Sequence, residues 1–211
     1  MLEQYASEFI ALAIIHFLAV VAPGPDFTIT IRQSITYGRT TGLITSLGIG
    51  AGISVHVIYT VLGVGLIVSQ SDTVFLIAKI IGATYLTYLG INLIRTKKST
   101  TSINIDEKAL ISMSSNKAFL IGFMTNALNP KATLFFLAVF TTIVSKETPL
   151  SVQAIYGVWM CSVNAAWFAL VSLLFSHKKI RSVFLCVGYW FERIMGGVLI
   201  GFAVKLVFSI K

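Results

Sequence analysis

Two stretches of this sequence decide how it folds: VAPGPDFTI at residues 21–29 and NALNPKATLFF at residues 126–136. Each places a proline inside an otherwise apolar run, and a charged residue follows directly, Asp26 after Pro25 and Lys131 after Pro130. Proline lacks a backbone N–H and its ring collides with the preceding turn, so it breaks or kinks a helix. Both stretches therefore predict a helix that is interrupted within an apolar segment.

The composition around these breaks predicts a membrane protein. Of 211 residues, 56% are hydrophobic and 11% are charged, whereas an ordinary soluble domain carries about 25% charged residues. The net charge of +8 does not indicate nucleic-acid binding, because Lys and Arg fall in short stretches between apolar runs rather than along one face. This distribution is instead typical of basic residues that set the orientation of membrane helices.

Apolar stretches long enough for the bilayer predict six transmembrane helices. A helix needs about 20 apolar residues to cross the hydrocarbon core, and the sequence favours spans from about residue 5, at 42–68, at 73–94, from about 118, at 152–175 and at 183–208. We expect one transmembrane domain over residues 1–211. Its halves, 1–94 and 118–211, are separated by a hydrophilic loop at 95–117, predicted to be cytoplasmic.

The basic residues alternate between the connections. The first, third and fifth connections hold Arg32 and Arg39, five basic residues within 95–117, and Lys178, Lys179 and Arg181, whereas the second holds none and the fourth holds only Lys146. By the positive-inside rule these three connections are cytoplasmic and both termini lie outside. A re-entrant first segment would move only the N-terminus inside.

The two breaks occupy corresponding places in the two halves. Because each half has three spans, an odd number, the second copy must be inverted, which predicts the three-plus-three inverted repeat of secondary transporters with broken first and fourth helices. A half-helix that begins after a break directs its positive dipole end at a carboxylate, and carbonyls freed before the break suit an ammonium group. The alternative is that both prolines only kink helices for packing.

Charged and polar residues near the breaks are the candidate site. A charge at membrane depth costs about 2.5–3.5 kcal/mol on insertion scales, so we expect Asp26 to bind ammonium or carry a proton and Lys131 to bind carboxylate. The alternative is a structural salt bridge or snorkelling to an interface. His56 is a second candidate for proton coupling, unless a neighbouring carbonyl or hydroxyl satisfies it. Asn126, Asn129 and Asn164 either bind substrate or tie helices together.

Three motifs carry a resemblance to a known family. They are the runs at 23–26, 126–132 and 82–90, and in order and spacing they resemble the lysine exporter / homoserine–threonine resistance family of amino-acid exporters. The resemblance covers essentially the whole chain. It implies export of amino acids or their derivatives across the bacterial inner membrane by a multi-pass protein driven by protons, and it admits a homodimer. It also implies site roles for Pro23, Gly24, Pro25, Asp26, Asn129, Pro130 and Lys131.

The resemblance leaves the substrate open, with only a loose likeness to the threonine and homoserine branch. An ion or metal exporter is the alternative within transport, but the sequence lacks the carboxylate, His and Cys clusters that metals require. An enzyme is not expected, because no His lies in a metal-binding or nucleophile motif. Neither a cofactor nor a nucleotide site is predicted. A membrane protein without transport activity would not need charged residues beside its breaks.

Overall fold

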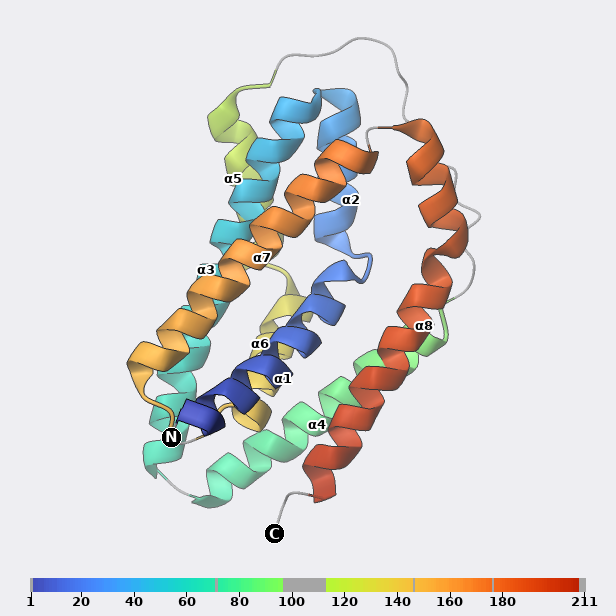
Figure 1. Ribbon diagram of the computed structural model, residues 1–211. Helices are drawn as coiled ribbons and strands as arrows, with labels where there is room; N and C mark the ends of the chain where they lie inside the picture. The colour runs from blue at the N-terminus through green and yellow to red at the C-terminus, as the bar shows by residue number, and fades with distance from the viewer. Residues whose placement is uncertain (1, 71, 97–112, 146, 176, 209–211) are drawn as a thin grey trace.

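The computed structural model describes residues 2–70, 72–96, 113–145, 147–175 and 177–208 (Figure 1). Its described part is all-helical, as predicted, and forms eight helices: α1 (Leu2–Val21), α2 (Pro25–Thr36), α3 (Arg39–Gln70), α4 (Asp72–Ile94), α5 (Ser115–Ala127), α6 (Pro130–Ile143), α7 (Leu150–Phe175) and α8 (Lys178–Phe208). There are eight rather than six because the first and fourth predicted spans are each divided in two.

Both predicted breaks are helix boundaries. α1 ends at Val21 and α2 begins at Pro25, with the two helices bent by 53°. Gly24 is the N-cap of α2, with extended backbone, and Pro25 follows as a residue whose fixed φ suits a first turn. α6 also begins at its proline, and the Asn129 side chain caps it by accepting a hydrogen bond from the backbone N–H of Lys131 at 3.0 Å.

Helix length and composition support several membrane crossings. In the described part of the chain, Arg39–Gly63 within α3 and Leu150–Phe175 are long and apolar enough to cross, and the bent α1–α2 pair adds a third candidate. α5 has 13 residues and α6 has 14, so each is about 20 Å long at 1.5 Å per residue and is too short to cross alone. The molecule is thus a helical, multi-pass membrane protein.

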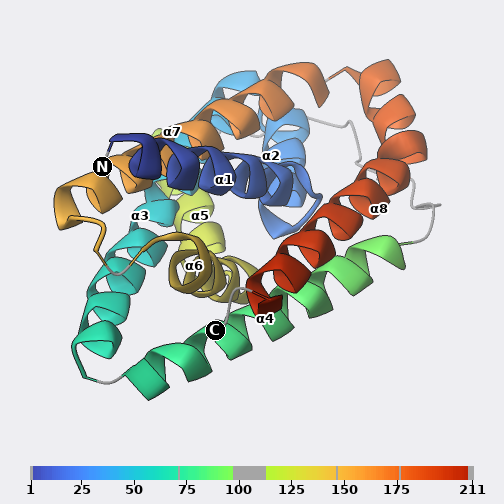
Figure 2. The same cartoon turned by 60° about the horizontal axis from the view of Figure 1, so that its bottom comes forward.

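The helices pack as two groups around α6. α3 lies along α5 and α7, and α4 lies along α8 (Figures 1 and 2). α4 and α8 approach most closely where Gly90 and Gly196 face one another, since a Cβ on either glycine would overlap the other's carbonyl oxygen. α6 lies between α3 and α4, and its buried residues form much of the core: Phe135, Phe136, Ala138, Val139 and Phe140.

The ends of the helices alternate between the two ends of the molecule. α2 ends and α3 begins at the end where α7 also gives way to α8, and α1 begins at the opposite end (Figure 1). The first and fifth predicted connections therefore share one end. Most of the predicted cytoplasmic loop, residues 97–112, and Lys146 lie outside the described residues. Which side of a membrane each end faces stays a prediction.

Candidate functional site

The two helix breaks lie about midway between the ends of the molecule (Figure 1). Residues of both breaks line one cavity. Its empty volume, counted with its open mouth, is about 480 Å³. Its wall is largely apolar, from Ile53, Phe135, Phe136 and Phe168 among others. The polar side chains of the wall are His16, Asp26, Asn126, Asn129, Lys131 and Asn164.

Asp26 enters the cavity from the second position of α2. The positive end of a helix dipole stabilises an acidic residue there by about 0.3–1 kcal/mol. Its Oδ2 accepts a hydrogen bond from the side-chain amide of Asn126 at 2.9 Å. Its Oδ1 is buried and has no hydrogen-bond partner in the described part of the chain. One carboxylate oxygen is therefore held in place, and the other is left for a donor such as an ammonium group.

Lys131 occupies the matching position at the start of α6. A cation is unfavourable at a helix N-terminus, so the ammonium group and the helix both favour an anion beside them. A Cβ on Gly24 would lie 3.8 Å from the Lys131 Nζ, which brings this ammonium against the first break. Glu192 and Asp26 interact with it electrostatically, and among the described residues no direct ion pair joins Asp26 to Lys131.

The backbone around Lys131 is held from another helix. The Tyr85 hydroxyl of α4 donates a hydrogen bond to the Lys131 carbonyl at 3.1 Å. Tyr85 belongs to the third motif of the sequence, at residues 82–90. This motif therefore contacts the second break, a relation that its position in the sequence did not reveal.

His56 does not line the cavity. Its Nε2 lies 2.8 Å from the Asn126 carbonyl oxygen, which can only accept, so this nitrogen carries the proton. Its Nδ1 then accepts from the Tyr59 hydroxyl at 2.9 Å. A carbonyl and a hydroxyl thus satisfy both ring nitrogens, and His56 holds the end of α5. Its role in proton coupling stays a prediction.

The structure gathers most of the predicted site residues. Gly24, Pro25, Asp26, Asn126, Asn129 and Lys131 line one cavity although 100 residues separate Asp26 from Asn126. The other three predicted residues, Pro23, Pro130 and His56, do not line it. Pro130 begins α6 and so acts on the site through the helix that it starts.

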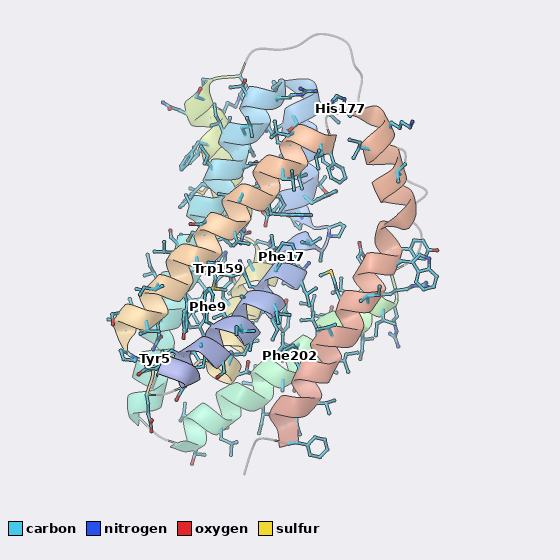
Figure 3. The ribbon with its side chains drawn as sticks, viewed as in Figure 1. Tyr5, Phe9, Phe17, Trp159, His177 and Phe202 are labelled. Carbon is cyan, nitrogen blue, oxygen red and sulfur yellow. The ribbon has the colours of Figure 1, made fainter. Side chains whose placement is uncertain are left out.

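Two further polar residues lie in the cavity wall, His16 of α1 and Asn164 of α7. The sequence left Asn164 open as ligand or helix tie and did not single out His16. The available signal was a histidine within an apolar helix, since an ionisable residue at membrane depth is a functional candidate by default. Aromatic rings pack on α1: the ring centroids of Phe9 and Trp159 are 5.2 Å apart (Figure 3). The ring centroids of His16 and Trp159 are 5.8 Å apart.

The charged residues of the cavity do not form a metal centre. Within the part of the chain that the structure describes, no three His, Cys, Asp or Glu side chains are grouped so that they could hold a metal ion. The polar groups that line the cavity are one carboxylate, one ammonium, one imidazole and three amides. This set matches an organic zwitterion better than a divalent cation.

Comparison with known proteins identifies the family of this chain. Residues 17–209 match the family described as LysE type translocator. The chain belongs to this family. It is accordingly a transporter and not an enzyme.

Relatives of this translocator share nearly its full length. It is 26% identical over 203 residues to the threonine efflux protein of Escherichia coli (strain K12), covering 95% of this chain and 98% of the relative. It is 27% identical over 203 residues to the threonine efflux protein of Salmonella typhimurium, with the same coverage. An uncharacterized membrane protein of Bacillus subtilis is 26% identical over 197 residues, covering 89% of this chain and 92% of that protein. No solved structure matches the translocator.

Proposed function

We propose that this translocator is a secondary-active exporter of small amino acids, of the threonine and homoserine type, in the bacterial inner membrane. The observation that carries the proposal is the cavity at the two breaks, where an acidic and a basic side chain lie at the starts of α2 and α6 and, in the part of the chain that the structure describes, form no direct ion pair. The names of the threonine efflux relatives support the substrate class.

The two charges suit the two ends of an amino acid. The carboxylate of the substrate binds the Lys131 ammonium and the N-terminal end of α6, where both the charge and the helix dipole attract an anion. The substrate ammonium binds the Oδ1 of Asp26, the carboxylate oxygen for which the described residues offer no hydrogen-bond partner. The apolar rings of the wall then surround the side chain. Neither an uncharged solute nor a lone metal ion would use both charges.

Export follows from two alternating openings of the same cavity. The halves 1–94 and 118–211 form an inverted three-plus-three repeat with six membrane crossings, in which the broken pairs α1–α2 and α5–α6 correspond. Equivalent positions support this relation: Gly24 and Asn129 are both N-caps, and each is followed by proline and then a charged residue. Rocking of one half against the other opens the site to each side in turn.

Protons supply the driving force, and Asp26 is the residue that exchanges proton and substrate. Its Oδ1 can bind either a proton or the substrate ammonium, and this competition couples the two. His56 remains the second candidate, acting through the Asn126 carbonyl that it holds. The end of the molecule that carries the α2–α3 and α7–α8 connections faces the cytoplasm, because it gathers Arg32, Arg39, Lys178 and Lys179.

The experiment that tests this proposal is efflux from cells preloaded with a panel of labelled amino acids, with and without the translocator. We expect faster efflux of threonine and homoserine, and loss of the difference when the proton gradient is collapsed. Unchanged efflux across the whole panel, with folded protein present in the membrane, would contradict amino-acid export and favour an ion exporter.

The coupling residue is tested by a second measurement on the same cells. Asp26→Asn keeps the hydrogen-bonding shape of the side chain but removes its charge and its proton exchange. We expect the variant to lose accumulation against a substrate gradient and to lose the pH dependence of efflux. A variant that still exports with the pH dependence of the wild type would exclude Asp26 as the coupling residue.

A further inference from the structure

His16 and Asn164 form a polar pair in the wall of the cavity, on helices other than those that bear the two charges. His16 is 1% exposed on α1 and Asn164 is 2% exposed on α7. The Asn164 Nδ2 lies 2.9 Å from the His16 Nε2 and 3.1 Å from the Met160 carbonyl oxygen. Both side chains line the cavity. The proposed function assigns no role to this pair.

The contacts of Asn164 determine which nitrogen of His16 carries the proton. The Met160 carbonyl can only accept, so the Asn164 side chain directs its NH₂ group, not its oxygen, toward both partners. The His16 Nε2 therefore accepts from Asn164, and the proton resides on Nδ1. The contact between His16 Nε2 and the Met160 carbonyl is longer, at 3.3 Å, and is not needed in this arrangement.

The Nδ1–H group of His16 is the free donor of the pair. It is buried and has no hydrogen-bond partner among the residues that the structure describes. The ring itself is held firmly, since Phe135, Phe136 and Trp159 pack around it with ring centroids 5.8–6.1 Å away. A buried N–H requires an acceptor oxygen. A fixed donor among the aromatic rings of this part of the wall therefore suits a ligand that carries one acceptor on a short apolar chain.

We propose that His16, oriented by Asn164, recognises the side-chain oxygen of the substrate and so selects hydroxyl-bearing amino acids over their apolar isosteres. This proposal rests on the proposed function. It also disfavours lysine and arginine: among the described residues that line the cavity, Asp26 is the sole carboxylate, and the substrate ammonium already engages it.

Threonine and valine provide the test, because they have nearly the same shape and differ in a hydroxyl against a methyl group. Efflux of each is measured from preloaded cells, and the ratio of their rates is compared between variants. We expect the wild type to favour threonine at least about tenfold, as a site built to bond a hydroxyl does. His16→Phe should bring the ratio close to 1 while valine efflux persists, and Asn164→Leu should lower it in part.

Two variants make this result specific to the subsite. His16→Gln retains an amide N–H donor and should restore part of the preference for threonine. Tyr156→Phe removes another bond between α7 and α1, from the Tyr156 hydroxyl to the Tyr5 carbonyl at 3.0 Å, outside the cavity wall. It should leave the ratio unchanged and so controls for loosened packing. The amount of folded protein is measured for each variant by size-exclusion chromatography.

The possible outcomes separate this proposal from the proposed function. A folded His16→Phe variant that keeps the wild-type ratio overturns the subsite while amino-acid export stands. The same holds if the wild type exports valine as fast as threonine, or exports basic amino acids preferentially, because the Nδ1–H group would then bind only water. Absence of gradient-dependent efflux of every amino acid from the wild type overturns the proposed function itself.

Discussion

The contact between α3 and α5 is close enough that one added methyl group should destabilise the protein. A Cβ on Gly122 of α5 would overlap the carbonyl oxygen of Thr45. It would also lie 2.9 Å from the Thr45 carbonyl carbon and 3.1 Å from the Ile49 backbone nitrogen. Gly48 makes the reciprocal contact, with the Phe119 carbonyl. Because all these neighbours are backbone atoms, they cannot rotate away, and Gly122→Ala forces the two helices apart.

The size of the effect follows from two opposing contributions. Overpacking costs about 1–3 kcal/mol, and an immovable backbone neighbour places this site near about 3 kcal/mol. Replacing glycine by alanine within a helix recovers about 1 kcal/mol of helix propensity. We therefore expect a net loss of about 2 kcal/mol, which lowers the melting temperature by about 4–8 °C in a chain of this size. Efflux should fall as well, because the shift moves Asn126, one turn further along α5.

The matched control is Gly197→Ala in α8, where a Cβ would meet nothing within 4 Å. This variant gains the same helix propensity without a clash, so its melting temperature should stay level or rise. Both variants are purified in the same detergent and unfolded thermally with a fluorescent probe. A Gly122→Ala protein as stable as Gly197→Ala would refute the close contact between α3 and α5.

Three further predictions concern single contacts. Lys131→Gln should abolish efflux while the protein stays folded, because it removes the cation that binds the substrate carboxylate; efflux above a tenth of the wild-type rate would exclude that role. Glu8→Ala should lower the unfolding free energy by about 1–3 kcal/mol, since the Glu8 carboxylate accepts from the Thr148 hydroxyl at 2.8 Å, and a thermal melt identical to the wild type would contradict this. Ser34→Ala should lower the unfolding free energy by only about 0.6 kcal/mol, because the 2.8 Å hydrogen bond between the Ser34 and Ser172 hydroxyls lies between membrane helices. A double-mutant cycle with Ser172→Ala measures the coupling energy, and a value above about 2 kcal/mol would be too large for one such bond.

Much of the fold could be read from the chain because its signals are local. Pro25 and Pro130 end one helix and begin another whatever surrounds them, since proline both removes a hydrogen-bond donor and fixes its own φ. The same locality explains why the sequence placed the charges at Asp26 and Lys131 directly after the breaks, where the structure has them. The number of membrane crossings could not be predicted from local sequence. Whether two short helices form one crossing depends on the angle between them, which tertiary packing sets.

The contents of the cavity were less predictable. His56 was a reasonable candidate from its position within an apolar span, yet the rotation of α3 directs its ring to the Asn126 carbonyl rather than into the cavity. His16, by contrast, lines the cavity and meets Asn164, 148 residues further along the chain. Both histidines look alike in the sequence, and only the orientation of their helices distinguishes them.

By itself, the sequence determined that this chain is an all-helical membrane protein with two interrupted helices, one interruption followed by an acidic residue and the other by a basic residue. Composition and proline act through solvent preference and local backbone geometry, which need no tertiary contacts. Only the tertiary structure decided which polar groups face one another: Asn126 with Asp26, Tyr85 with the Lys131 backbone, and Asn164 with His16. The physical reason is that lipid and protein interior are similarly apolar. A helix that is apolar on every side therefore has no hydrophobic pattern that indicates which face packs against its neighbours.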